Sequence, residues 1–189
     1  MRRNIVLAIV ITTAVGAVLG AGVLAGRVLK PGSAVPLSPD TTWTEVSWPF
    51  PVDQWGKGKA YQCKSEHCGT DVKLYLRAKI GFCDCVSTID DDEVDRVGDV
   101  DLVGGARAAL GPGRPIAVRW MKGRSRGYAL AGSASMPRSA LGIAFHDRCD
   151  MIVATAAIAG GQPAAYEDAV LAFLNSDRVL RWAEVTLGL

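Results

Sequence analysis

Histidine is scarce in this sequence, and neither an internal repeat nor a strong charge imbalance is present. Two histidines occur among the 189 residues, so most acid–base and metal mechanisms would have to rely on carboxylates. The glycines between positions 104 and 113 follow neither the dinucleotide nor the phosphate-loop spacing. These absences argue against nucleotide-dependent enzymes, and we expect a protein with no cofactor and no catalysis of its own.

The charge balance gives no reason to expect nucleic acid as a partner. Lysine and arginine together number 21, aspartate and glutamate 19, and the net charge is +2. Proteins that bind nucleic acid usually carry a clustered basic excess. Charge is instead segregated along the chain: residues 90–101 are acidic and residues 114–126 are basic. The acidic stretch lacks the residue order of a calcium-binding EF-hand loop. It predicts a short helix or turn that faces solvent, with Asp90–Asp92 at the N-terminal end if it is a helix.

The longest uncharged stretch runs from Ile5 to Ala25, with Arg2 and Arg3 before it and Arg27 and Lys30 after it. At about 1.5 Å per helical residue, a run of roughly twenty apolar residues matches the ~30 Å hydrocarbon layer of a bilayer. The sequence therefore predicts a cytoplasmic tail (1–4), one transmembrane helix acting as a signal anchor (5–26), a linker (27–40) and a folded domain (41–189). A signal peptide cleaved after Val23-Leu24-Ala25 is the alternative.

The short basic N-terminus and the cysteines predict where the domain lies. Arginines in a short N-terminal tail favour a cytoplasmic N-terminus and a translocated domain. Five cysteines in one domain fit an oxidising compartment. The frequent alanine, glycine, valine and arginine resemble the usage of a GC-rich bacterium. We therefore expect a single-pass protein of a bacterial inner membrane with a periplasmic C-terminal domain.

Beyond the linker, the sequence predicts strands followed by helices. Val72 to Ile80 alternates apolar and polar residues, which indicates a half-buried strand. Further strands are expected over 60–63, 116–121, 128–131, 141–145 and 151–158, with a basic turn at 122–125. Helical patterns begin at Pro163 and after Ser176. These elements predict an α+β domain in which C-terminal helices cover an antiparallel sheet.

The cysteines are disulfide candidates: Cys63, Cys68, Cys83, Cys85 and Cys149. Cys63 and Cys68 flank a four-residue turn and can close it, whereas the strand over 72–80 separates Cys68 from Cys83 by more than the ~7 Å that a bridge allows. Cys83 or Cys85 would then pair with Cys149 and leave one thiol. Two alternatives remain open: copper or zinc binding by Cys83, Cys85 and His67, and a redox-active Cys83–Cys85 pair.

Two further segments are candidates for contact with a partner or with lipid headgroups. The first combines aromatic residues with prolines: Trp43, Trp48, Phe50 and Trp55. It would form either a lid over the domain's own core or a docking patch. The second is basic: Arg119, Lys122, Arg124 and Arg126. It would either stay solvated or meet anionic headgroups or an acidic protein.

Together these features predict a non-catalytic, membrane-anchored periplasmic protein. We expect an accessory, assembly or binding component of an envelope membrane-protein complex, whose partner is an integral membrane or periplasmic protein. The alternative is an envelope thiol-redox or metal-handling protein that uses the clustered cysteines.

Overall fold

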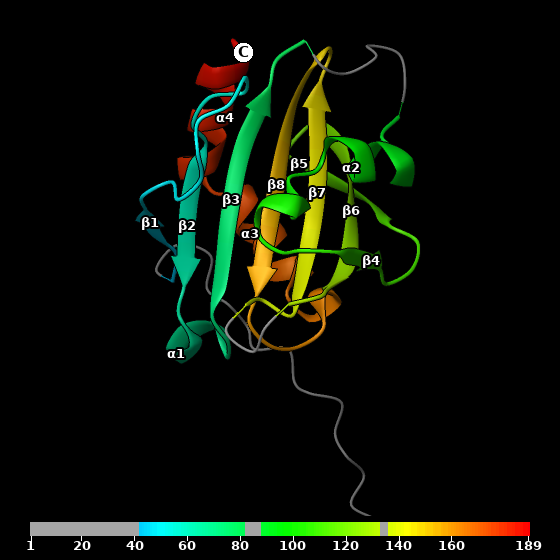
Figure 1. Cartoon of the computed structure of the whole chain (residues 1–189). Coiled ribbons are helices and arrows are strands. Elements are labelled where there is room, and N and C mark those ends of the chain that lie inside the picture. The colour runs from blue at the N-terminus through cyan, green and yellow to red at the C-terminus, as the bar shows by residue number, and fades with distance from the viewer. Residues whose placement is uncertain (1–41, 82–87, 133–135) are drawn as a thin grey trace, which may run out of the picture. The chain divides into compact units, whose positions relative to one another are not determined.

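An antiparallel sheet of eight strands runs through the described part of the chain (Figure 1). The structure, a computed structural model, describes residues 42–81, 88–132 and 136–189. The strands lie in the order β1-β2-β3-β8-β7-β6-β4, and β5 pairs with β6 beside β4. Their bounds are β1 (Thr44–Val46), β2 (Lys59–Cys63), β3 (Val72–Lys79), β4 (Arg107–Ala109), β5 (Arg114–Val118), β6 (Met121–Leu130), β7 (Ser139–Asp147) and β8 (Asp150–Ile158).

Helices are few and short beside this sheet. They are α1 (Ser65–Cys68), α2 (Asp91–Val97), α3 (Glu167–Leu174) and α4 (Asp177–Leu187), with short 3-10 turns η1 (Val100–Leu102) and η2 (Pro163–Ala165). The expected fold class, an α+β domain behind a transmembrane helix, is therefore wrong: the described residues form mostly antiparallel sheet. None of the helices in the described ranges is both long and apolar enough to cross a bilayer, and the span expected over 5–26 lies outside those ranges.

Strand β6 shows why the sheet is larger than expected. The turn predicted at 122–125 does not exist, because β6 continues from Met121 to Leu130 and pairs with β7 from Lys122 onward. Basic residues at positions 122, 124 and 126 resemble a polar turn, but every second residue of a strand faces the same side. The actual turn lies earlier, at Arg119 and Trp120, between Val118 and Met121.

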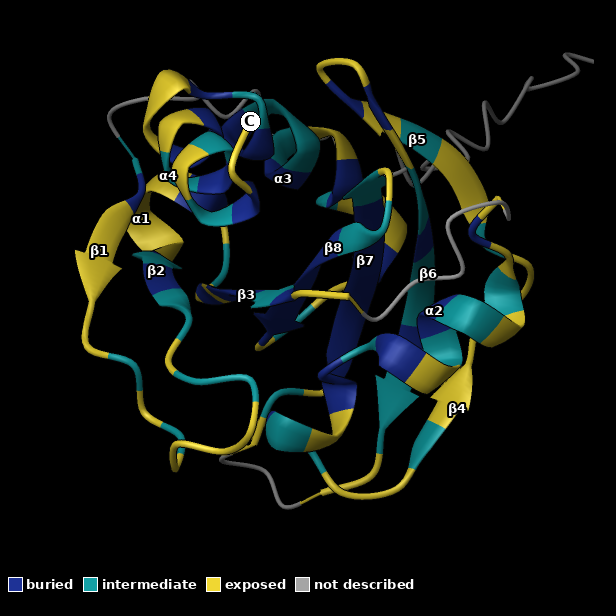
Figure 2. Ribbon diagram, turned by 90° about the horizontal axis from the view of Figure 1, so that it is seen from above, coloured by how far each residue is buried: buried dark blue, intermediate teal, exposed yellow. Residues whose placement is uncertain are grey.

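Each face of the sheet has its own buried layer (Figure 2). Helices α3 and α4 cover one face, where Phe173, Leu174 and Leu180 pack with strand residues such as Leu74 and Ile143. The opposite face carries two smaller clusters, one under the segment before β2 and one under α2. Strand β3 is therefore buried on both faces along most of its length, so the prediction of a half-buried strand is wrong.

Candidate functional site

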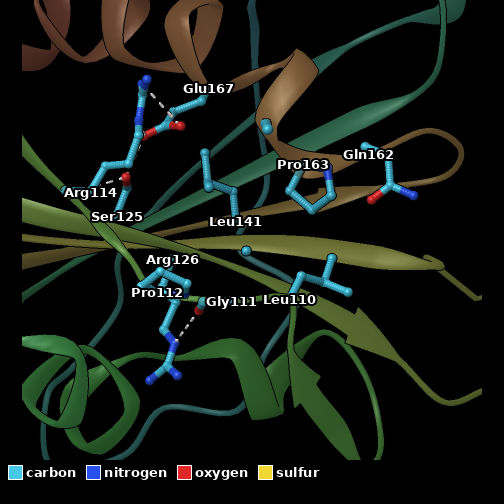
Figure 3. A pocket seen from close by; sticks show the side chains of 12 residues that line it. Leu110, Gly111, Pro112, Arg114, Ser125, Arg126, Leu141, Gln162, Pro163 and Glu167 are labelled. Carbon is cyan, nitrogen blue, oxygen red and sulfur yellow. Dashed lines mark hydrogen bonds and ion pairs between the residues drawn. The ribbon is translucent and has the colours of Figure 1, made fainter.

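A cleft of about 230 Å³ opens at the β4–β5 edge of the sheet, where the chain from Leu110 to Pro112 faces η2 and the start of α3 (Figure 3). Leu110, Pro112, Leu141, Pro163 and Ala164 provide apolar walls. Arg114, Ser125 and Glu167 form a polar group in its lining, with the Gln162 side chain also in the wall. The cleft therefore combines apolar surface with a few placed polar groups, as small binding sites usually do.

The pairing of β6 explains why the sheet opens at this point. Strand β5 pairs with Met121–Ser125 of β6, and β4 pairs with Tyr128–Leu130 farther along the same edge. The residues between β4 and β5 bulge outward, and the Leu110 amide donates to the Gly127 carbonyl at 2.9 Å. A Cβ added to Gly127 would lie 3.3 Å from Pro163, so glycine allows η2 to pack closely on β6.

Glu167 is a buried carboxylate that forms an ion pair and a hydrogen bond with other residues of the cleft. Arg114 contacts it through Nε at 3.2 Å and through Nη2 at 3.0 Å, and the Ser125 hydroxyl donates to the same carboxylate. The negative charge of Glu167 raises the pKa of Arg114. The Arg114 side chain is 60% exposed, so one side of the guanidinium still faces solvent.

Arg126 contributes to the cleft from the opposite face of β6. Its Nε donates to the Gly111 carbonyl at 3.3 Å, and its Nη1 lies 2.7 Å from a carboxylate oxygen of Asp95 in α2. Arg124, two residues earlier, pairs with Asp91. Asp95 also accepts a hydrogen bond from the Tyr128 hydroxyl, and burial together with this bond raises the pKa of Tyr128. The acidic and basic segments of the sequence thus pair with each other.

The segment Gly123-Arg124-Ser125-Arg126-Gly127 has the Gly-x-Ser-x-Gly spacing of serine hydrolases, which our sequence analysis overlooked. In those enzymes the serine is exposed on a sharp turn between a strand and a helix. Ser125 instead lies within β6, is 2% exposed, and donates to a carboxylate that Arg114 already holds. The structural context of a nucleophile is therefore absent at this serine.

The two histidines do not supply a base to this cleft. His67 lies in α1, and the Nδ1 atom of His146 in β7 is 3.1 Å from the Arg148 carbonyl oxygen. Cys149 is disulfide-bonded, so it is not a free thiol beside His146. No cluster of three or more histidine, cysteine or acidic side chains suited to a metal ion is found among residues 42–81, 88–132 and 136–189.

The cysteines that the structure describes are bridged. Cys63 and Cys68 form a disulfide across α1 with their Cα atoms 6.0 Å apart, which is the pairing that the turn favours. Both residues are buried. Cys83 and Cys85 lie outside the described residues, as do the pairing proposed for them with Cys149 and the redox and metal alternatives that use them.

The aromatic candidates lie mostly against the domain itself. Trp43 is buried and stacks on Phe173 of α3, with ring centroids 4.9 Å apart. Trp48 and Phe50 pack on Tyr75 of β3, with centroid distances of 6.0 and 4.8 Å. Trp55 is half-buried beneath the ammonium of Lys79. Trp48, Phe50 and Trp55 therefore form a lid over the face opposite the C-terminal helices, whereas Trp43 packs in the layer that those helices cover.

Under this lid lies a buried group of charges that sequence analysis missed. Arg77 is only 3% exposed and pairs with Asp99 at 2.6 Å and with Asp53 at 2.7 Å. Lys79 lies 3.1 Å from Asp99 and donates to the Val97 carbonyl. The hydrogen bond from the Trp55 amide, with help from Arg77, lowers the pKa of Asp53. The alternation in β3 indicated solvent at Arg77 and Lys79. Their partners Asp53 and Asp99 lie 24 residues before and 22 residues after Arg77, so no local pattern pairs them.

The basic candidates are largely engaged within the molecule. Arg124 and Arg126 pair with α2, and Arg119 lies 3.7 Å from Asp177 at the start of α4. Lys122 is exposed. The cleft residues Ser125 and Glu167 were not predicted as site residues. Glu167 has one sequence signal, a carboxylate in the first helical turn after Pro163, and that signal alone does not identify a site.

These features define an antiparallel-sheet domain with an edge cleft that lacks a catalytic constellation among the described residues. The chain matches no protein-family model, and no curated protein is significantly similar to it in sequence. Its function therefore has to be argued from the site itself.

Proposed function

We propose that this chain is a non-catalytic binding component of a bacterial envelope complex, held at the membrane by its apolar N-terminal stretch with the folded domain on the periplasmic side. The cleft beside Glu167 carries the proposal, and its partner is a protein of the membrane or the periplasm. The apolar run at residues 5–25 and the disulfides support the location.

The size of the cleft supports a protein partner. Pockets that enclose drug-sized ligands occupy about 300–1,000 Å³. A cleft of about 230 Å³ is smaller, and it suits one anchoring side chain of a larger partner. Leu110 and Pro112 are exposed at its rim and extend the apolar surface outward.

The charges around the cleft support recognition by shape. Arg114 is paired with Glu167 and Asp168, and Arg126 with Asp95. A charged ligand would have to compete with these internal pairs, whereas an apolar side chain would not have to break them. Binding should therefore depend only weakly on salt, in contrast to attraction by anionic headgroups.

Site-specific photo-crosslinking in cells that make the full chain tests this function. A photoreactive amino acid at Leu110 should give a discrete adduct, and one at Val185, which is 83% exposed on α4, should not. The substitution Ala164→Trp fills the cleft and should abolish the adduct. Ala165→Trp is the matched control, because Ala165 is exposed on η2 but does not line the cleft. Equal adducts from both positions, or an adduct that persists in Ala164→Trp, would contradict the proposal.

A further inference from the structure

We propose that the side chain that anchors the partner in this cleft is aromatic, and that a backbone carbonyl beside it accepts a hydrogen bond from the Gly127 amide. The inference rests on the proposed function and deepens it, because it names the chemistry of the anchor. Small probes can measure it without any partner, so the two proposals can fail separately.

The ion pair of Arg114 uses one edge of its guanidinium. Nε and Nη2 lie 3.2 and 3.0 Å from the two carboxylate oxygens of Glu167. The N–H donors of a guanidinium lie in its plane, so this pairing does not engage the two flat faces of the group. The Arg114 side chain lines the cleft and is 60% exposed, so a ligand can reach one of these faces.

An aromatic ring can use such a face while the ion pair stays intact. The negative face of the ring is attracted to the cation. A ligand carboxylate would instead compete with Glu167 for the guanidinium edge, and an aliphatic side chain would gain apolar contact alone. Pro112 and Pro163, on opposite walls of the cleft, supply apolar surface for the rest of the ring (Figure 3). Arg114 therefore favours an aromatic anchor over an acidic or aliphatic one.

The Gly127 amide supplies the second observation. The Leu110 amide donates to the Gly127 carbonyl, and the Ala131 amide donates to the Ala106 carbonyl. Alternate residues of a strand bond to the same neighbour, so the Gly127 N–H also faces this edge of β6. A regular ladder would return a bond from Gly127 to the Leu110 carbonyl, but within the described ranges that bond is not formed, because the chain bulges outward between β4 and β5. Gly127 lines the cleft, so a ligand carbonyl can accept from its N–H.

The two groups lie close enough for one residue of the partner to engage both. Arg114 pairs with Ser125, which is two residues, or about 7 Å, from Gly127 along β6. In a peptide, the ring of an aromatic residue lies a few bonds from its own backbone carbonyl. A single aromatic residue can therefore place its ring against Arg114 and a carbonyl on Gly127.

NMR titration of the full chain in detergent tests the anchor. The probes N-acetyl-phenylalaninamide and N-acetyl-cyclohexylalaninamide have the same backbone groups and similar side chains, but only the first has a π-system. The first should bind with a dissociation constant on the order of 1 mM, shift the Arg114 Nε–H signal, and bind about two- to fivefold more tightly than the second, as an exposed cation–π contact provides. Dialysis fixes the free probe concentrations, because both probes partition into detergent. Equal binding, or tighter binding of the cyclohexyl probe, would show that apolar contact alone decides the affinity and would overturn the inference.

The exchange of the Gly127 amide with solvent tests the hydrogen bond. Saturation with the phenylalanine probe should slow this exchange and move the amide proton downfield. The Ala131 amide, which already donates to Ala106, should keep its exchange rate. An exchange rate at Gly127 that is unchanged at saturation would overturn this part of the inference.

Variants of the chain connect the binding to this cleft. Arg114→Met removes the cation, so the preference for the aromatic probe should vanish. If this variant does not fold, the comparison of the two probes on the wild type still decides. Ala164→Trp should abolish the binding of both probes, and Ala165→Trp should leave it unchanged, because Ala165 does not line the cleft. An aromatic preference that survives in Arg114→Met, or binding that survives in Ala164→Trp, would overturn the inference.

The outcomes separate this inference from the proposed function. A photo-adduct from Leu110 without a response to either probe would overturn the inference and leave the proposed function standing. Binding of the aromatic probe without any adduct from Leu110 would support the inference and contradict the proposed function.

Discussion

Arg77 shows how a charged residue came to be buried in a strand. Its guanidinium donates to Asp99 through Nε at 2.8 Å and through Nη2 at 2.6 Å, and to Asp53 through Nη1 at 2.7 Å. The Trp48 ring covers it at 5.8 Å. Two carboxylates and an aromatic face replace the water that the cation has lost, so the net interaction raises the pKa of Arg77 despite its burial.

Replacing Arg77 should therefore be strongly destabilising. Arg77→Met keeps much of the side-chain volume but leaves Asp99 buried with Lys79 as its remaining ion-pair partner. Breaking a buried pair from one side typically costs about 3–5 kcal/mol, and we expect a loss of that order in the free energy of unfolding. Urea denaturation measures it. Arg96→Met is the control, because Arg96 is exposed and its ion pair with Glu93 lies at the surface, and it should change stability by less than about 0.5 kcal/mol.

The backbone of Arg148 adopts a strained conformation. It is the first residue of the two-residue turn between β7 and β8, and its φ is 53°, a region that L-residues other than asparagine and aspartate seldom adopt. Arg148→Gly should relieve this strain and leave the protein about 1 kcal/mol more stable than Arg148→Ala. The alanine variant removes the same side chain without relieving the backbone, so thermal denaturation of the pair isolates the strain. Equal melting temperatures for both variants would show that the turn carries none.

At the scale of elements, α2 is the clearest case of charge pairing between distant segments. Asp91 and Asp95 are four residues apart on α2, and their partners Arg124 and Arg126 are two apart on β6. These spacings place each set on one face of its element. The hydrogen bond from Arg124, supported by the Gly113 amide, lowers the pKa of Asp91. The segregation of charge along the chain therefore serves the packing of α2 on the sheet.

The stability that Asp91 provides should depend on pH. A carboxyl whose pKa is lower in the folded than in the unfolded protein stabilises fully above its unfolded pKa, about 3.9, and this contribution is lost as the pH falls through the folded pKa. We expect Asp91→Asn to be less stable than the wild type by about 0.5–1 kcal/mol at pH 7, with the difference shrinking below about pH 4. Asp92→Asn, an exposed neighbour with the same charge change, serves as the control in urea denaturation at several pH values. A difference that is unchanged at pH 3 would contradict the assignment.

The elements also show what the sequence could and could not predict. Local signals were sufficient to place β3, though not to predict its burial, and to place the helix after Ser176. In the acidic stretch they favoured a short helix or turn, and Asp90 accepts a hydrogen bond from the Glu93 amide at the N-terminus of the helix that forms there. They failed at residues 122–125, because the partners that make alternating arginines part of a strand lie some thirty residues earlier. The fold class was wrong for the same reason, since short edge strands such as β4 depend on their neighbours.

The cleft is even less visible in the sequence than the strands. It depends on β4 and β5 both pairing with β6, which creates the bulge at Leu110–Gly113, and on the arrival of η2 from the far end of the chain. No residue spacing within one segment of the sequence predicts that β4, β5 and η2 come together around β6. The Gly-x-Ser-x-Gly spacing around Ser125 would even have indicated a hydrolase, and the strand context around Ser125 is what argues against that activity.

At the scale of the whole molecule, the first described segment, around Trp43, packs against the C-terminal helices α3 and α4. Trp43 and Tyr61 both pack on Phe173 of α3, each with ring centroids 4.9 Å apart. Arg178 of α4 also donates to the Trp43 carbonyl at 3.1 Å. The C-terminal helices cover one whole buried layer. Packing of these helices on the sheet therefore both buries that layer and brings the first and last described segments into contact.

Phe173→Ala tests this closure. Removing a fully buried phenylalanine typically costs about 3–5 kcal/mol, and here it would also detach Trp43 from its stacking partner. We expect a loss of that size in urea denaturation, together with a red shift of tryptophan emission before global unfolding, because Trp43 would become solvated. Val185→Ala is the control, since Val185 is exposed on the outer face of α4. If Phe173→Ala lost stability but kept the native tryptophan emission, Trp43 would still be buried without Phe173. The contact with α3 would then not be what fixes the N-terminal segment.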